Sequence, residues 1–167
     1  MGRSIGAEIA LAAYVFPLVL AGLSDLCSLR IPNWLTATLA AAFPVVALLL
    51  GGEVDWLSHV AAGAAVFAGA AALFALRLMG GGDVKLLAAV ALWIGLGRLL
   101  PFLAITALIG VVLALAVVLL RLPVVHVLLC RLAPPLSALV ERKMAVPYGV
   151  PIAIAGLLMI PSLGFLA

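Results

Sequence analysis

With 167 residues, of which 68% are hydrophobic and only 9% are charged, this chain cannot be a water-soluble domain, because such domains carry about 25% charged residues. It is an integral membrane protein, surrounded by lipid. The net charge of +3 is spread over the connections between apolar stretches, so the sequence does not predict a nucleic-acid partner. Cys27 and Cys130 are far apart and form no CxxC pair, so neither zinc binding nor a disulfide framework is predicted. No cofactor is predicted either.

Six apolar stretches predict an all-α, polytopic membrane protein that forms a single domain over residues 1–167. The predicted spans are Ala7–Leu23, Trp34–Leu50, His59–Leu78, Leu86–Gly97, Leu99–Leu120 and Val146–Leu166. The fourth span is only about 18 Å long, against a hydrocarbon core of about 30 Å. Either its flanking Lys85 and Arg98 reach the two surfaces, or it begins from a loop already sunk in the membrane.

Two finer features accompany these spans. In the third span, Ala61, Ala65 and Gly69 recur at every fourth residue, a pattern typical of close helix–helix contact. We expect this face to hold the glycine run that follows against a neighbouring helix. Between the fifth and sixth spans, residues 136–144 separate apolar from polar side chains, which predicts a helix lying on the membrane surface.

The distribution of cationic residues predicts the orientation of the chain. With six spans, the connections after the first, third and fifth contain seven cationic residues: Arg30, Arg77, Lys85, Arg121, Arg131, Arg142 and Lys143. The opposite side has only Arg3 and Arg98, together with the acidic Glu53 and Asp55. Because Lys and Arg are enriched in cytoplasmic loops, the first side faces the cytoplasm and both termini face outward.

A glycine run ending in a carboxylate, Gly80-Gly81-Gly82-Asp83, separates the third and fourth spans. A carboxylate in a bilayer costs roughly 2.5–3.5 kcal/mol, so such residues usually face a cavity and serve a function. Glycine allows another chain to approach the backbone closely. The run therefore predicts a turn that presents Asp83 to an extended peptide. A flexible loop with a chance acidic residue is the alternative interpretation.

Asp25 closes the first span and lies, by this topology, at the same membrane face as Asp83. Two carboxylates a few ångströms apart cannot both ionise, so one pKa rises while the other stays low. Such a pair offers a base to activate water and an acid to protonate a carbonyl oxygen or a leaving amine. The alternative is purely structural, with ion pairs between Asp25 and Arg30 and between Asp83 and Lys85.

Three blocks in this order and topology carry a resemblance: Ser24-Asp25 followed by Arg30-Ile31-Pro32-Asn33-Trp34-Leu35-Thr36, then Gly80-Gly81-Gly82-Asp83-Val84-Lys85-Leu86, then Val146-Pro147-Tyr148-Gly149. The chain resembles the prepilin peptidase family, the GxGD-type membrane aspartyl proteases that process type IV pilin precursors. The resemblance implies that Asp25 and Asp83 form a catalytic dyad. It also implies cleavage after a glycine in the short basic leader of a prepilin, whose leader and N-terminal helix would be the bound partner, at the cytoplasmic face of the bacterial inner membrane.

Nine further residues are expected to shape the active-site loops or to bind substrate: Gly80, Gly82, Lys85, Arg30, Pro32, Asn33, Pro147, Tyr148 and Gly149. Gly80 and Gly82 are expected to shape the loop. Lys85 either biases the ionisation of the dyad or reaches the membrane surface. Pro32 suits the entry of a helix, because proline is favoured at a first helical position. Tyr148 either donates a hydrogen bond to substrate or anchors the chain at the interface.

The chain departs from the long members of the family, which carry an extra cytoplasmic segment with paired CxxC cysteines and also methylate the new amino terminus. It resembles the short peptidases of Flp/Tad-type pilus systems, so methyltransferase activity is not predicted. Two other functions remain open from the sequence. One is a small cation- or proton-coupled transporter that uses Asp25 and Asp83, and the other is a non-catalytic assembly subunit of a pilus or secretion machine. The sequence does not predict the oligomeric state.

Overall fold

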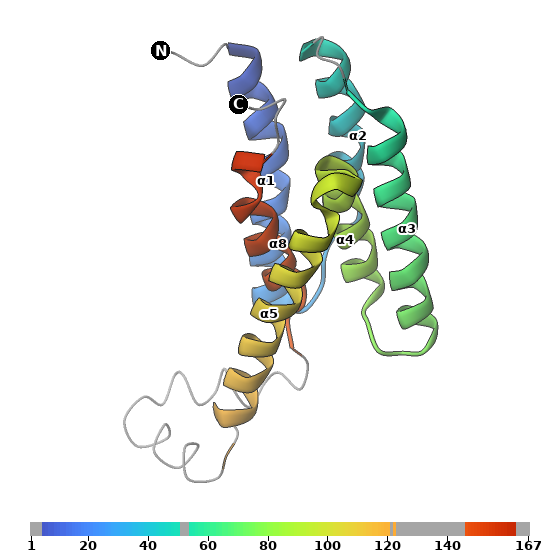
Figure 1. The fold of residues 1–167 in the computed structure, drawn as a ribbon. Coiled ribbons are helices and arrows are strands. Elements are labelled where there is room, and N and C mark those ends of the chain that lie inside the picture. The colour runs from blue at the N-terminus through green and yellow to red at the C-terminus, as the bar shows by residue number, and fades with distance from the viewer. Residues whose placement is uncertain (1–4, 51–53, 121, 123–145, 163–167) are drawn as a thin grey trace.

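A computed structural model describes residues 5–50, 54–120, 122 and 146–162 (Figure 1). Within these ranges all regular structure is helical. The elements are α1 (Ile5–Ser28), α2 (Asn33–Leu50), α3 (Trp56–Ala75), α4 (Gly81–Ile94), α5 (Leu96–Leu120), α8 (Gly149–Leu158) and a closing 3-10 turn at Ile160–Ser162. The predicted all-α class is confirmed.

The six α-helices of the described residues include three, α1, α3 and α5, that are long and apolar enough to cross a membrane. By contrast, α4 has 14 residues and α8 has 10, which correspond to about 21 Å and 15 Å. The α1–α2 and α3–α4 connections and the start of α8 lie at one end of the bundle, called here the carboxylate end (Figure 1). The end of α2 lies at the other end, and the α4–α5 connection lies part of the way toward it, beside the start of α3.

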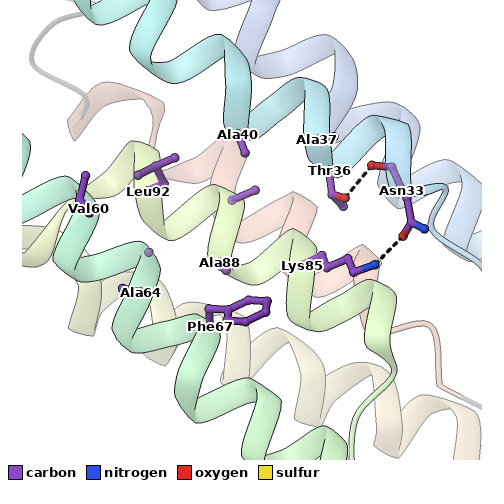
Figure 2. A pocket seen from close by; sticks show the side chains of 12 residues that line it. Asn33, Thr36, Ala37, Ala40, Val60, Ala64, Phe67, Lys85, Ala88 and Leu92 are labelled. Atoms are coloured by element: carbon purple, nitrogen blue, oxygen red, sulfur yellow. Dashed lines mark hydrogen bonds between the residues drawn. The ribbon is translucent and has the colours of Figure 1, made fainter.

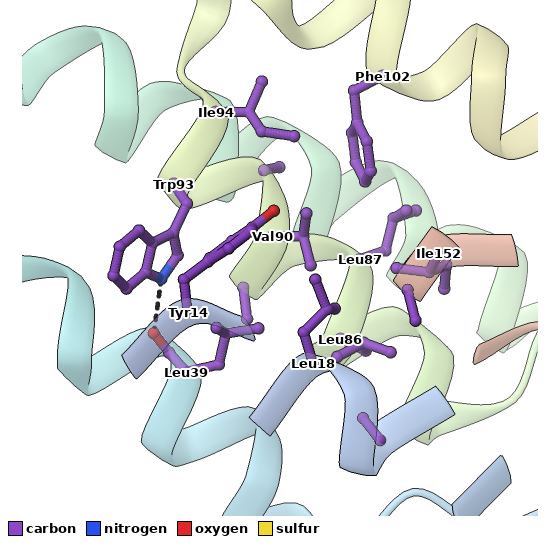
Figure 3. Packing of buried hydrophobic residues seen from close by; sticks show 14 of the residues in the cluster. Tyr14, Leu18, Leu39, Leu86, Leu87, Val90, Trp93, Ile94, Phe102 and Ile152 are labelled. Atoms are coloured by element: carbon purple, nitrogen blue, oxygen red, sulfur yellow. Dashed lines mark hydrogen bonds between the residues drawn. The ribbon is translucent and has the colours of Figure 1, made fainter. Parts of the chain in front are cut away.

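The short helix α4 forms the centre of the bundle and packs against α2, α3, α5 and α8. Its buried residues are Val84, Leu86, Leu87, Ala89, Val90, Ala91, Trp93 and Ile94. The Trp93 indole N–H donates to the Leu39 carbonyl oxygen of α2 at 2.7 Å (Figure 3). The Tyr14 ring of α1 packs 5.0 Å from that of Trp93, and the Tyr14 hydroxyl donates to the Gly156 carbonyl oxygen of α8 at 3.0 Å. These contacts join α1, α2 and α8 around α4.

The far end of α4 is fixed on α3. Gly95 ends the helix with a φ of 72°, which disfavours any residue carrying a Cβ. A ring nitrogen of His59, Nδ1, hydrogen-bonds to the Leu92 carbonyl oxygen at 2.8 Å, and the Leu96 N–H donates to the Ser58 hydroxyl at 2.9 Å. The fourth helix therefore ends at Ile94, three residues before the predicted end.

The predicted packing face of α3 is wrong by about one position. Its buried residues are Ala62, Gly63, Val66 and Ala70. By contrast, Ala65 and Gly69 are exposed, and a Cβ on Gly69 would meet nothing within 4 Å. A Cβ on Gly63 would lie 3.3 Å from the Leu92 Cβ of α4. Apolar residues suit both lipid and helix contacts, so the spacing of small residues alone does not identify the packed face.

Several predictions fall on residues outside the described ranges. These are the surface helix at residues 136–144, the cationic side chains at 121, 131, 142 and 143, and the position of Glu53. The sixth predicted span is described as far as Ser162. Asp55 lies at the end of the bundle away from the carboxylates, where its side chain caps α3 by accepting from the Ser58 N–H at 3.1 Å.

Candidate active site

Asp25 lies inside α1 and not, as predicted, at its end. The helix continues to Ser28 and closes at Leu29, whose φ is 55° and whose N–H donates to the Asp25 carbonyl oxygen at 2.9 Å. The Ser24 hydroxyl donates to the Arg30 carbonyl oxygen at 2.7 Å and ties the following connection back onto the helix. The Asp25 side chain is only 5% exposed, so its carboxylate requires polar partners.

One partner of Asp25 comes from the last helix. The Gly149 N–H, at the first residue of α8, donates to Asp25 Oδ2 at 2.7 Å. The free N–H groups and the dipole at a helix N-terminus favour negative charge. The contact therefore fixes the carboxylate of α1 at the beginning of α8 and stabilises negative charge on it.

Asp83 occupies the first turn of α4. The helix begins at Gly81, so the predicted glycine loop is largely helical, and only Gly80 stands outside it as an extended N-cap residue with φ −73° and ψ 144°. An acidic residue in a first helical turn is favourable, because unpaired N–H groups point toward it. Asp83 thus stands at the carboxylate end of α4, ahead of the apolar part of the helix.

The two carboxylates influence one another. Burial and the nearby charge of Asp25 raise the pKa of Asp83 from 3.8 to about 6, while a hydrogen bond from the Gly80 backbone acts in the opposite direction. Asp83 is half-buried. It can therefore hold a proton at a pH at which an ordinary aspartate is ionised.

Two cavities of about 500 and 450 Å³ share Asp25, Leu29, Gly80 and Asp83 in their walls. We call them the first and second carboxylate cavities. The first extends along residues 30–33 of the α1–α2 connection. The second extends toward residues 77–79 of the α3–α4 connection and toward Val146 and Tyr148 before α8. An extended peptide that passed from one cavity to the other would cross both carboxylates.

Close packing around Ile31 explains two of the glycines. A Cβ on Gly82 of α4 would lie 3.1 Å from the Ile31 Cβ. A Cβ on Gly149 of α8 would lie 2.8 Å from the Ile31 Cδ1 and 2.9 Å from Asp25 Oδ2. Ile31 is thus packed between α4 and α8 beside the carboxylates. These glycines provide space, and neither has the positive φ of a turn glycine.

The other predicted site residues divide between the cavities. Arg30, Pro32 and Asn33 line the first cavity, and the 39%-exposed Tyr148 lines the second. Pro147 is buried next to Tyr148. Neither of the two predicted roles of Tyr148 is tested by this arrangement.

Lys85 lines neither carboxylate cavity. Residues two positions apart on a helix point in different directions, and the Lys85 Nζ donates to Asn33 Oδ1 at 2.9 Å. The Lys85 ammonium is thus directed toward α2, and the ion pair with Asp83 considered in the structural alternative is not the contact that Lys85 makes.

Two features of the site were not predicted. The N–H of Gly149 leaves no signal in a sequence, because every residue except proline carries one. Arg77 lines the second carboxylate cavity and follows Leu76, the C-cap residue of α3. Its φ is 61°, a conformation that a non-glycine residue rarely adopts. Its only signal was a cationic residue shortly before the glycine run. Within the described residues, no three side chains among His, Cys, Asp and Glu come together as metal ligands would.

Comparison with known proteins agrees with this arrangement. The model of the type IV leader peptidase family matches residues 12–115, a range that contains Asp25, Asp83 and the connection around Ile31. No curated protein and no solved structure gives a significant match. The match extends over more than half of the chain. The chain therefore belongs to the type IV leader peptidase family and is a membrane peptidase of that general kind.

Proposed function

We propose that this protein is an aspartyl endopeptidase that removes the short basic leader of type IV or Flp prepilins. Cleavage takes place after a glycine, at the cytoplasmic face of the bacterial inner membrane, and Asp25 and Asp83 form the catalytic dyad. The observation that carries the proposal is the meeting of these two carboxylates, from α1 and α4, in the walls of the same two cavities. Membership of a leader peptidase family supports it.

The surroundings of the carboxylates suggest a division of roles. Asp25 accepts the Gly149 N–H and is suited to remain charged, so it acts as the base. Asp83, whose pKa is raised to about 6, carries the proton and acts as the acid. A water molecule placed between them is then activated from one side, and the peptide carbonyl is polarised from the other.

The reaction follows from these roles. Asp25 takes a proton from water as the water oxygen attacks the carbonyl carbon, while Asp83 donates its proton to the carbonyl oxygen. The product is a neutral gem-diol. Transfer of a proton from Asp25 to the amide nitrogen breaks the C–N bond, and the return of a hydroxyl proton to Asp83 leaves a carboxylic acid, an amine and the starting dyad. All atoms come from peptide and water.

The dyad predicts a pH dependence for cleavage of prepilin by the purified enzyme. Because Asp83 must be protonated to act as the acid, kcat/KM should fall as pH rises above about 6, by about tenfold per unit at the alkaline end. At low pH the rate should fall again as the base becomes protonated. The measurement follows the loss of the leader by mass at each pH. A rate that keeps rising above neutral pH would exclude Asp83 as the acid.

Orientation is tested separately with reporters fused to the chain. The excess of cationic residues in the connections after the first, third and fifth predicted spans predicts a cytoplasmic active site. A reporter active only in the periplasm should be active after Ala167 and silent when inserted between Arg131 and Lys143. The opposite result would be a periplasm-specific reporter that is silent after Ala167 and a cytoplasm-specific reporter that is active there. That result would contradict six crossings and would indicate that α4 does not span the membrane.

A further inference from the structure

A larger cavity lies on the outer surface of the bundle, beside the carboxylates. Its volume is about 620 Å³, and it lies over α4 between α2 and α3 (Figure 2). Small residues from all three helices, among them Ala37, Gly63, Ala64 and Ala88, keep it wide. Ala37 and Ala64 are exposed, so the cavity opens to the surrounding lipid. We call it the lateral groove.

The lateral groove is polar at one end only. At the carboxylate end, the Lys85 Nζ donates to Asn33 Oδ1 at 2.9 Å, and the Thr36 hydroxyl donates to the Asn33 carbonyl oxygen at 2.9 Å (Figure 2). All the other lining residues are alanine, glycine, valine, leucine or phenylalanine. The polarity therefore changes along the groove as it does for a helix that leaves the membrane surface and enters the hydrocarbon.

The lateral groove is also continuous with the site of chemistry. Asn33 lines both the groove and the first carboxylate cavity, whose wall contains Asp25 and Asp83. Along α4 the groove extends from Lys85 to Leu92, a distance of about 10 Å or two helical turns. A chain that follows the groove toward its polar end passes over Asn33 to the carboxylates.

We propose that the lateral groove binds the first apolar helix of the substrate, directly C-terminal to the bond that is cut, with the amino end of that helix at Asn33 and Lys85. The proposal rests on the proposed function, because it concerns the substrate of that same site. Small lining residues allow a helix to approach closely. An acidic residue in the first turn of the substrate helix, a position that favours such residues, would pair with the Lys85 ammonium. The groove thus holds the substrate in the membrane while the extended segment before it reaches the dyad.

The test compares two substrates of the purified enzyme: a full prepilin and a soluble peptide that spans the cleaved bond but lacks the apolar helix. Ala64→Phe fills the groove, and Ala65→Phe, at the exposed neighbouring position outside it, is the matched control. Ala64→Phe should raise KM for the full prepilin by about tenfold, the effect of losing a well-packed contact, and leave peptide cleavage unchanged. Equal effects on both substrates, or none on either, would overturn the proposal.

A cross-linking measurement identifies the molecule bound in the lateral groove directly and does not depend on turnover. A photoreactive residue in place of Ala37, in the Asp83→Asn protein, should capture prepilin in membranes, whereas the same residue in place of the exposed Ala41, outside the groove, should not. Capture of lipid alone at position 37 would overturn the proposal. If the wild-type enzyme cleaves neither substrate, the proposed function fails, and that outcome is distinct from the loss of selective cross-linking.

Discussion

Asp25→Asn and Asp83→Asn should each abolish cleavage of prepilin, with a loss of on the order of 1,000-fold or more in kcat. Asparagine keeps the shape of the side chain but can neither accept the proton of water nor carry one to the carbonyl oxygen. The double variant should be no worse than either single variant, because groups that act as a unit are strongly non-additive. The measurement is single-turnover cleavage per folded molecule.

The control for this prediction is Asp55→Asn. Asp55 caps α3 at the opposite end of the bundle, and asparagine is also a good capping residue, so activity should not change. If the two carboxylates only stabilised the bundle, neutralising one would lower the amount of protein in the membrane and leave the activity of each molecule intact. A well-expressed Asp83→Asn protein that still matures prepilin at a near-normal rate would rule out the dyad.

Gly149→Ala should lower kcat by about 100-fold, the scale expected when a reacting group is displaced by about 1 Å. The new methyl group would lie 2.9 Å from Asp25 Oδ2 and 2.8 Å from Ile31 Cδ1, so the carboxylate, the α8 N-terminus or both must move. Gly69→Ala is the control, because a Cβ there meets nothing within 4 Å. Rates are compared at equal amounts of membrane-inserted protein.

A second substitution separates the effect of Gly149→Ala on the position of Asp25 from its steric clash with Ile31. Ile31→Val removes Cδ1 and makes room for the methyl group of Gly149→Ala on one side, while the contact with Asp25 remains. The Gly149→Ala/Ile31→Val double variant should restore any membrane abundance that Gly149→Ala loses, but it should not restore activity. Recovery of full activity would mean that Gly149 matters only for packing against Ile31.

The fold class and the meeting of the two carboxylates could be predicted, because both depend on strong signals. Charged residues make up only 9% of this chain, so their positions indicate where helices approach their ends. Counting the crossings between Asp25 and Asp83 then places both residues at one end of the bundle. The short fourth helix was also visible in the sequence. Its beginning was not, because a glycine run next to an apolar stretch is typical of a loop. Here Gly81 and Gly82 enter the helix, where Gly81 faces Phe74 of α3 and Gly82 faces Ile31.

The packing faces and the Gly149 contact could not be predicted, for different reasons. In a membrane bundle the side facing lipid is as apolar as the side facing other helices, so Ala62 and Ala65 look alike in the sequence although the first is buried and the second exposed. The donor to Asp25 is a backbone N–H. Such a group has a role only once α8 is placed, and placement depends on tertiary contacts such as the hydrogen bond from Tyr14 to Gly156.

The contacts between α1 and α8 have a consequence for the synthesis and assembly of the protein. Asp25 and Gly149 are 124 positions apart, and Tyr14 and Gly156 are 142 apart. A ribosome makes α8 after α1 to α5, so Asp25 gains the Gly149 N–H only when α8 has been made. In the proposed mechanism, the base acquires the Gly149 N–H as its hydrogen-bond donor only after α8 has docked against α1. We therefore expect cleavage activity to arise only once α8 is in place.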